Sequence, residues 1–519
     1  MTTHQIMVVL SIKLRNSGTS IPFSVSRKTR KMELAGQEDE FEYGEVQNAV
    51  QVKKFRNFHF LLEIHDFVHR ALRAQATTTA NFRGPWFTSL NYLFTCNPIN
   101  IQYILTKNFS NYEKGEFRQN FQVLGDGILA AESETWKYSR TLLHSLFKKK
   151  SFELFSHKIL QNKILTCLLP VLDYVQTRGM EVDLQDVFQR FTFDYSCSFI
   201  FGYDPQSLSI HFPEVACAKA FTDTGETIMY RHAVPKSFWK LRERLQIGAE
   251  KKLATASKFF DEFLYERIKL KREELSKFNK NINIETDAQT DLLATLIKEE
   301  EGNEQVDDKF LRDTTFSLLA AGRETITVAL TCLCWLVATH PSVEAKILQE
   351  IKEQIVEKGL NPSTLGVKDV KNLVYIHGAI CEALRLFPPV PLNFKQAIKA
   401  DILPSGDEVK PNTMLLLSFY SVGRLEEVWG EDCLEFKPER WISDTGCILN
   451  VPSYEFTCFS TGPRTCLGKN MSFIILKIMA TAVMWNYHIQ VVEGHPVYPA
   501  IAPVLLMKHG LKVKITKRG

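Results

Sequence analysis

One cysteine stands in a short loop whose other residues would suit a metal-bound thiolate. The loop reads Phe459-Ser-Thr-Gly462-Pro-Arg464-Thr-Cys466-Leu-Gly468. Glycines let a backbone approach a bulky planar group and adopt positive φ angles. Backbone N–H groups around the sulfur would stabilise its negative charge, and Arg464 would neutralise a carboxylate on the bound group. A purely structural cysteine is the alternative for any isolated residue of this type, but here every position of the loop agrees with a ligand role.

An acid and an alcohol stand side by side on a long apolar helix expected from Asp307 to His340 and ending at Pro341. Glu324 and Thr325 would together deliver protons to a bound oxygen. Gly322 precedes them, and a glycine inside a helix costs about 1 kcal/mol relative to alanine. Either a ligand pressed against the backbone or close helix packing would explain it.

Two further pairs have helical spacing. Trp136 and Arg140 are four residues apart and therefore share a helix face; considered alone, this pair predicts a surface stack. Glu382 and Arg385 are three residues apart among apolar neighbours. Burial of that pair predicts a structural bidentate ion pair.

These motifs, in this order, resemble the cytochrome P-450 family at every fixed position of the cysteine loop. The resemblance implies haem b as cofactor, with Cys466 as the metal ligand, and Glu324 and Thr325 as the catalytic acid and alcohol. It implies that Arg440, in Phe-Lys-Pro-Glu-Arg-Trp, joins the Glu382–Arg385 pair. The other residues that it implies for cofactor binding are Arg464, Phe459, Gly462, Gly468, Trp136, Arg140 and Lys395.

The implied fold is mainly α, with about a dozen helices and small sheets around a buried haem. The implied activity is insertion of one atom of O₂ into a C–H bond of an apolar substrate. Phe-Arg-Gly-Pro-Trp-Phe, Ala-Ala-Gly-Arg-Glu-Thr and the cysteine loop resemble the plant branch of fatty-acid ω-hydroxylases and midchain alkane hydroxylases. Alkaloid- or phenol-oxidising relatives are one alternative. A haem-thiolate isomerase or dehydratase that needs no reductase, or a haem sensor, is another.

No Gly-x-Gly-x-x-Gly motif follows a strand pattern, so electrons are expected from a separate NADPH–cytochrome P-450 reductase. Arg440, Lys437, Lys469 and Lys477 are candidates for meeting that acidic partner. The family resemblance implies the cytosolic face of the endoplasmic reticulum membrane. The substrate pocket is expected from Phe316, Leu318, Leu319 and Ala320, with Val390–Leu392 and Ile501–Val504.

The whole chain of 519 residues has 45% hydrophobic residues and a net charge of +4, which is too small to predict a nucleic-acid partner. Its eleven cysteines lack paired spacing, which predicts free thiols rather than a disulfide framework. Residues 1–54 read as a disordered segment without a membrane-spanning helix, and residues 55–519 as the haem domain. Residues 81–87 are expected to form a turn, and Tyr92–Cys96 a strand that Pro98 follows with a helix.

Overall fold

The computed structural model describes residues 64–74, 77–83, 91–279, 291–300 and 306–518. All of them belong to one compact unit, Leu62–Gly519. The segment expected at residues 1–54 lies outside the described residues, as do residues 84–87 of the expected turn.

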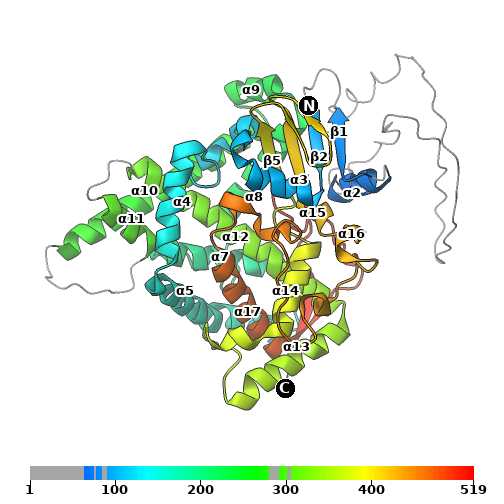
Figure 1. The fold of residues 1–519 in the computed structure, drawn as a ribbon. Helices are drawn as coiled ribbons and strands as arrows, with labels where there is room; N and C mark the ends of the chain where they lie inside the picture. The colour runs from blue at the N-terminus through cyan, green and yellow to red at the C-terminus, as the bar shows by residue number, and fades with distance from the viewer. Residues whose placement is uncertain (1–63, 75–76, 84–90, 280–290, 301–305, 519) are drawn as a thin grey trace. The chain divides into compact units, whose positions relative to one another are not determined.

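Helices make up most of the described chain, which confirms the mainly α fold (Figure 1). The longer helices are α2 (Ile64–Ala74), α4 (Ser133–Phe147), α5 (Lys150–Lys163), α6 (Leu169–Thr177), α7 (Leu184–Phe201), α8 (Ala216–Ala233), α9 (Lys236–Leu245), α10 (Ala249–Asn279), α11 (Leu292–Glu300), α12 (Asp308–Ala338), α13 (Pro341–Gln354), α14 (Val374–Leu386) and α17 (Lys469–Asn486). Short ones are α3 (Pro98–Gln102), α15 (Phe419–Val422) and α16 (Glu426–Trp429). Single turns or short irregular helices are η2 (Tyr103–Lys107), η3 (Phe109–Asn111), η4 (Gly115–Leu124), η5 (Ile164–Leu168), η6 (Val356–Lys358), η7 (Asp369–Asn372), η8 (Pro438–Trp441), η9 (Thr457–Phe459) and η10 (Gly462–Arg464).

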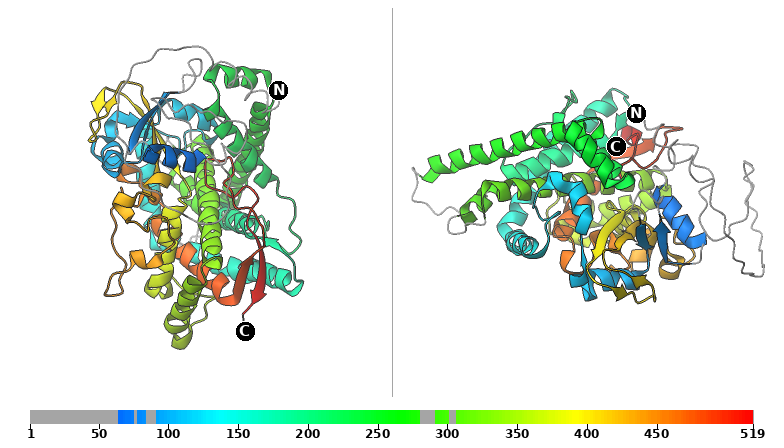
Figure 2. Two further views of the ribbon diagram at one scale, coloured as in Figure 1. Left: turned by 90° about the vertical axis from the view of Figure 1, so that its right-hand side faces the viewer. Right: turned by 90° about the horizontal axis from the view of Figure 1, so that it is seen from above.

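The predicted long helix is α12, which runs through the middle of the unit (Figure 2). Its start is capped by Asp307, whose side chain accepts a hydrogen bond of 2.7 Å from the backbone N–H of Phe310. Pro341 begins the next helix, as the missing N–H of proline requires. Most of its side chains are buried against α7, α10, α14 and α17. The helix is therefore a rigid support for whatever binds along it.

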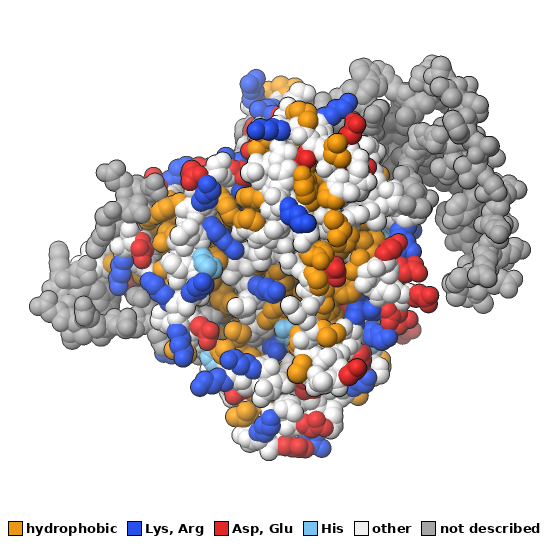
Figure 3. All heavy atoms as spheres, in the orientation of Figure 1, with side chains coloured by type: hydrophobic (Ala, Val, Ile, Leu, Met, Phe, Trp, Pro, Cys, Tyr) orange, Lys and Arg blue, Asp and Glu red, His pale blue; other side chains and the backbone are white. Residues whose placement is uncertain are grey.

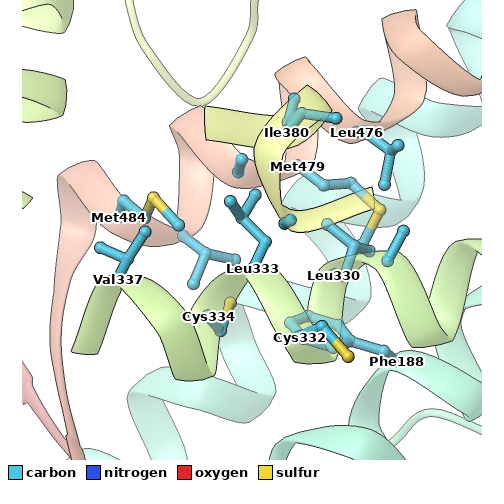
Figure 4. Close-up of a cluster of buried hydrophobic side chains, with 14 of the residues drawn as sticks. Phe188, Leu330, Cys332, Leu333, Cys334, Val337, Ile380, Leu476, Met479 and Met484 are labelled. Carbon is cyan, nitrogen blue, oxygen red and sulfur yellow. The ribbon is translucent and has the colours of Figure 1, made fainter. Parts of the chain in front are cut away.

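Apolar side chains from α7, α12, α14 and α17 form one continuous core. Figure 4 shows Cys332 and Cys334 of α12 in this core, beside Leu330 and Leu333. Both thiols are buried, and none of the eleven cysteines forms a disulfide. The prediction of free thiols is confirmed.

A five-stranded sheet of order β1-β2-β8-β5-β3 lies beside the helical body. Its strands are β1 (Thr79–Arg83), β2 (Asn91–Thr95), β3 (Tyr112–Glu113), β5 (Leu392–Ala397) and β8 (Met414–Ser418). Strands β4 (Val182–Asp183), β10 (Lys512–Lys517) and β9 (Tyr487–Val491) form a second sheet, and β6 (Asp401–Ile402) pairs with β7 (Glu408–Val409). Antiparallel pairing of β5 with β8 sets Lys395 opposite Leu415. This pairing holds Lys395 in the interior of the protein.

The expected strand near Tyr92 is confirmed as β2, and the helix at Pro98 as α3. The turn expected from Asn81 is wrong for its first three residues, because Asn81–Arg83 belong to β1 and pair with β2. Asparagine and arginine are weak strand formers, so only the partner strand makes the extended conformation favourable here.

Candidate active site

The cysteine loop lies directly before the N-terminus of α17. The backbone N–H of Cys466 donates to the carbonyl oxygen of Phe459 at 2.8 Å, which closes the loop. The Phe459 ring packs on Phe473 at 5.2 Å and has the Lys469 ammonium 5.7 Å from its centre. Cys466 therefore projects from a loop that its own backbone and the first turn of α17 hold in place.

Part of the Cys466 side chain is accessible to solvent, whereas most of the other cysteines are buried. The protein atoms around its sulfur still remove some of its hydration and raise the pKa of the thiol, while the backbone N–H of Gly468 and the positive charges of Arg140 and Lys469 act to lower it. The N-terminus of an α-helix also favours a nearby negative charge. A metal ion would overcome the remaining preference for the protonated thiol, because coordinated thiols are deprotonated. Cys458 is partly buried and thus less exposed than Cys466, and burial raises the pKa of its thiol well above the ordinary value.

The fold requires glycine at one of the two glycine positions of the loop but not at the other. Gly462 has a φ of +72°, and a Cβ there would lie 2.0 Å from the carbonyl oxygen of Leu105, so the fold itself requires glycine. Gly468 has a φ of −88°, and its Cβ would meet only Ser472 Oγ at 3.8 Å. Neither backbone strain nor protein packing demands glycine at 468, which leaves room there for a bound group.

A cluster of basic side chains, here called the cation cluster, gathers beside the loop: Arg464, Arg140, Lys395 and Lys114. Arg464 Nη2 donates to Glu132 Oε2 at 2.6 Å and to the Ala131 carbonyl at 2.9 Å, and its guanidinium lies 4.4 Å from the Trp136 ring centre. Its Nε is buried without a hydrogen-bond partner in the described chain. The predicted Trp136–Arg140 helix is confirmed as α4, and Trp136 is buried rather than at the surface.

Lys395 of β5 is almost fully buried. Among the described residues, its Nζ has one hydrogen-bond acceptor, the carbonyl oxygen of Tyr112 at 3.3 Å. Burial, with the positive charges of Arg464 and Lys114, lowers the pKa of Lys395 to about 7. An additional anion close to this ammonium would restore its positive charge.

Lys114 is a basic residue of the cluster that sequence reasoning missed. Burial and the charge of Arg464 lower its pKa to about 8. Its backbone N–H donates to Glu132 Oε1 at 2.9 Å. No regular spacing links Lys114 to the loop, since it precedes η4 and lies more than three hundred residues away in sequence. The only local feature of the sequence that could have pointed to Lys114 is the next residue, Gly115, which has a positive φ.

The middle of α12 is open on one face. Leu318, Ala321, Gly322 and Thr325 are partly exposed on this face within a mostly buried helix, and we call these four residues the α12 window; Ala320 is also partly exposed, but on another face. Thr325 Oγ1 donates to the carbonyl oxygen of Ala321 at 2.7 Å. Residues 318, 321 and 325 repeat at three or four positions, so they share one face of the helix. That face offers apolar area with a single hydroxyl.

Glu324 lies beside Thr325 in sequence but engages partners outside the window. Its Oε1 forms an ion pair with Nη1 of Arg323, and its Oε2 accepts a hydrogen bond of 3.3 Å from Gln189 of α7. The Arg323 guanidinium is buried and lies 4.8 Å from the Phe221 ring centre. The structure therefore does not bring the Glu324 carboxylate and the Thr325 hydroxyl together, because successive residues of a helix point about 100° apart.

Gly322 packs against α7, since a Cβ there would lie 3.0 Å from Ser196 Oγ. Of the two explanations left open by the sequence, helix packing is the one that this contact supports.

The pocket prediction is wrong for two of its residues. Phe316 and Leu319 are fully buried on the opposite face of α12, where Phe316 packs on Phe260 of α10 at 4.5 Å. With 3.6 residues per turn, Leu318 and Ala321 lie on the same helix face as Thr325, whereas Phe316 lies on the opposite face. The loop at 501–504 does reach the helices, because a Cβ on Gly225 of α8 would lie 3.4 Å from Pro503.

The Glu382–Arg385 pair is buried and bidentate, as predicted. Arg385 Nε and Nη2 donate to the two carboxylate oxygens at 2.7 Å each, and both side chains are fully buried. Arg440 Nε donates to Glu382 Oε1 at 3.3 Å, which completes the expected triad. Arg440 also donates to Asp432 Oδ1 at 2.6 Å. The triad ties α14 to the segment that leads into the cysteine loop.

The expected partner-binding residues divide into two groups. Lys477 is buried and donates to the Val370 carbonyl at 2.9 Å, so the prediction of a surface charge there is wrong. Arg440 is partly exposed, but Glu382 and Asp432 already pair with its guanidinium. Lys437 and Lys469 are exposed, although Lys437 pairs with Asp432 at 2.8 Å.

These features fit the haem that the resemblance implies. The cation cluster has four basic side chains near two acidic ones, Glu132 and Glu113, and its excess of positive charge matches a group that carries two carboxylates. Within the described residues, no three or more His, Cys, Asp or Glu side chains gather as a metal site. A metal that only Cys466 binds would thus need its other ligands from a bound planar ring. Such a ring has room beside Gly468 and the α12 window.

Comparison with known proteins agrees with this site. The family model described as Cytochrome P-450 matches residues 54–515. The chain is 41% identical to "Alkane hydroxylase MAH1" of Arabidopsis thaliana, over 89% of this chain and 90% of that protein. It is 37% identical to "Noroxomaritidine synthase" of Narcissus aff. pseudonarcissus MK-2014, over 88% of each. The crystal structure of CYP102L1, a cytochrome P-450, superposes with a TM-score of 0.72 at 19% identity, covering 88% of this chain and 98% of that one, and shows the fold.

Proposed function

Because the chain belongs to the cytochrome P-450 family, and is therefore a haem-containing monooxygenase, we propose that it hydroxylates a long-chain alkane, fatty acid or derivative. The observation that carries the proposal is the α12 window, where Leu318 and Ala321 offer apolar surface to a substrate. The acid that adjoins Thr325 in sequence, Glu324, is paired with Arg323. A hydrocarbon chain requires only such apolar area. The similarity to an alkane hydroxylase supports the same substrate class.

We propose that Cys466 would bind the haem iron and that the cation cluster would hold the two haem carboxylates. When bound, haem with a thiolate ligand would supply the activation of O₂ and the insertion of one oxygen atom into a C–H bond. The chain contributes position and charge: the Phe459 carbonyl and Gly468 N–H orient Cys466, and Arg464 retains an unused Nε donor. Lys395 and Lys114 would gain a counter-ion in place of their mutual repulsion.

Thr325 is proposed to position a proton at the α12 window. Its hydroxyl donates to the Ala321 carbonyl, so its oxygen remains free to accept a hydrogen bond from water or from another donor in the window. Glu324 would contribute only after leaving Arg323 and Gln189. We therefore assign the larger effect to Thr325 and a smaller one to Glu324.

The test of substrate class is a chain-length series with purified, haem-loaded enzyme, read as the visible absorbance shift on ligand binding. Each buried methylene contributes about 0.8 kcal/mol, so four more carbons should tighten binding roughly a hundredfold until the site is full. Product analysis should then find hydroxylated chains. Equal affinity for short and long chains would overturn the proposal.

The second candidate is oxidation of a phenolic amine. The 37% identity to noroxomaritidine synthase favours it. A cationic amine would need an acid or an aromatic cage near the window, and Glu324 is already neutralised by Arg323. A strong absorbance shift with a phenolic amine, together with a flat chain-length series, would favour this candidate.

Electrons are proposed to come from a separate NADPH–cytochrome P-450 reductase that binds on the cysteine-loop side through exposed lysines such as Lys437 and Lys469. Basic and acidic side chains are interspersed over the face seen in Figure 3. Charge reversal at Lys469 should slow reduction by the reductase at low salt, while dithionite still reduces the haem. Equal rates for the variant and the unchanged protein would exclude this surface.

We also propose that the protein lies on the cytosolic face of the endoplasmic reticulum membrane, with α9 in the interface. Phe238, Leu241 and Leu245 of this helix are 38%, 53% and 58% exposed, and exposed basic residues flank them. Trp239 holds the opposite face, buried beneath the Arg231 guanidinium at 4.3 Å. Exposed apolar residues beside basic ones are typical of helices that lie in a membrane interface.

Vesicle binding tests the role of α9. Leu241→Glu with Leu245→Glu should weaken binding to anionic vesicles, whereas Leu154→Glu on α5, another exposed leucine, should not. Equal binding by all three proteins would contradict it. Among the described residues, only α12 is long and apolar enough to cross a membrane, and 67% of its apolar window is buried inside the protein, as in a core helix.

A further inference from the structure

His232, near the C-terminal end of α8, is enclosed by aromatic rings from two other elements. Its ring centre lies 4.6 Å from that of Phe394 on β5, and 5.8 Å and 5.7 Å from those of Phe117 and Phe121 on η4. Within the described residues, the pKa of the ring depends first on burial and second on the hydrogen bond to the Ile228 carbonyl, and not on a charged side chain. A polar ring therefore stands alone in an apolar setting.

The hydrogen bonding of His232 defines its tautomer. Nδ1 lies 2.9 Å from the carbonyl oxygen of Ile228, which can only accept, so Nδ1 carries the hydrogen. Burial lowers the pKa of the ring to about 4, so the ring is neutral near pH 7. Nε2 is then a bare acceptor, and it is buried without a partner in the described chain. An acceptor left without a donor in such a place is costly, and a ligand donor would remove that cost.

The elements around His232 also border the reaction site. Lys395 of the cation cluster follows Phe394 directly on β5. The backbone N–H of Asp126, two residues after η4, donates to Asp313 Oδ2 of α12 at 2.8 Å. Gly127 is so close to α12 that a Cβ would lie 2.1 Å from Ser317 Oγ, beside Leu318 of the α12 window. A long substrate whose reacting carbon lies at the window would thus extend among elements that carry the His232 rings.

We propose that Nε2 of His232 accepts a hydrogen bond from a neutral hydroxyl group of the substrate, an aliphatic alcohol or a phenol, and so selects against a carboxylate. This inference rests on the proposed function, because it assumes an apolar substrate at the same site. A carboxylate near pH 7 has no proton to donate and would place its charge among phenyl rings, where burial is costly. An alkane fits the rings but leaves Nε2 unpaired.

The experiment compares matched ligands by the absorbance shift of the haem-loaded enzyme. The aliphatic set is dodecane, 1-dodecanol and dodecanoate; the aromatic pair is hexylbenzene and 4-hexylphenol. In at least one set the hydroxyl compound should bind about tenfold more tightly than its hydrocarbon, as one buried hydrogen bond allows. Dodecanoate should bind less well than 1-dodecanol. The set that shows the advantage identifies the hydroxyl as aliphatic or phenolic.

Variants assign the effect to the ring. His232→Phe should abolish the hydroxyl advantage while hydrocarbons bind as before, and His232→Gln, which retains an acceptor near the same place, should keep part of it. His65→Phe is the matched control, because His65 is also a buried histidine with an unpartnered ring nitrogen and a pKa lowered to about 4, but on α2. Should His232→Phe load too little haem, His232→Leu and the Gln variant give the comparison.

The outcomes separate this inference from the proposed function. If chain length has no effect, the proposed substrate class fails, yet the aromatic pair still tests His232. If neither set shows a hydroxyl advantage, or if His232→Phe keeps it, the role of His232 is refuted whatever the chain-length series shows.

Discussion

Of the described acidic residues, Glu382 is the one whose replacement by alanine we expect to destabilise the protein most. The carboxylate is fully buried and accepts hydrogen bonds from three side chains and one backbone group. Arg385 donates twice at 2.7 Å, Trp441 Nε1 at 2.8 Å, the Lys437 N–H at 3.2 Å and Arg440 at 3.3 Å. The substitution would leave the Arg385 charge in the core without its anion.

The magnitude follows from that burial. Removing one partner of a buried ion pair costs on the order of 3–5 kcal/mol. This is a large share of the roughly 5–15 kcal/mol that stabilises a folded protein, and it lowers the folding equilibrium constant by about 150- to 5000-fold. Arg385 keeps its bonds to backbone carbonyls, including that of Cys433 at 2.6 Å, but these cannot supply the missing negative charge. Because the triad leads into the cysteine loop, haem loading should fall as well.

The assay is guanidinium unfolding followed by circular dichroism and by haem absorbance, on haem-loaded proteins. Glu382→Gln, which keeps the shape but loses the charge, should fall between Glu382→Ala and the unchanged protein. Glu134→Ala is the control: Glu134 pairs with Lys137 at 2.7 Å with both side chains largely exposed, so its loss should cost less than about 1 kcal/mol. A cost below about 1 kcal/mol for Glu382→Ala, with normal haem content, would refute the reasoning.

Three other predictions concern the haem site. Cys466→Ser should abolish the strongly red-shifted absorbance band of the reduced, CO-bound form, and Cys458→Ser should retain it; the reverse pattern would overturn the assignment of the ligand. Thr325→Ala should still bind haem and substrate but divert NADPH to peroxide; an unchanged product yield per NADPH would leave Thr325 without a proton role. Without haem, Lys395 has a pKa of about 7, which is below its unfolded value. Binding of the haem carboxylates would raise this pKa, so the ammonium takes up a proton as haem binds. Haem affinity should therefore fall as pH rises above about 7. Lys395→Met should flatten that dependence, measured as haem transfer to apomyoglobin; equal pH slopes in the two proteins would exclude the role.

The motifs that the sequence identified correctly all lie within a few residues or one helix. The bidentate Glu382–Arg385 pair follows from a spacing of three on α14, the start of α12 from Asp307, and its end from Pro341, which begins the next helix. In the cysteine loop, the positive φ of Gly462 agrees with the conformational reason for a glycine there. Local stereochemistry decides such features, so they are readable from residue types.

The direction of side chains on α12 was partly readable and was misjudged. Phe316 and Leu319 were expected in the pocket because they are apolar and close to Glu324 in sequence. The helix turns them toward α10 and α8 instead. Adjacency in sequence does not mean a shared face, and the 3.6-residue period is the rule that applies.

Only the tertiary structure decided which distant groups meet. Lys114, Glu132 and Arg464 come from three separate segments, and β5 brings Lys395 beside them. His232 becomes an unpaired acceptor solely because η4 and β5 close over it. The physical reason is that burial and electrostatic interaction depend on distance in space, which side-chain packing determines, whereas spacing along the chain limits distance only within one turn or one helix.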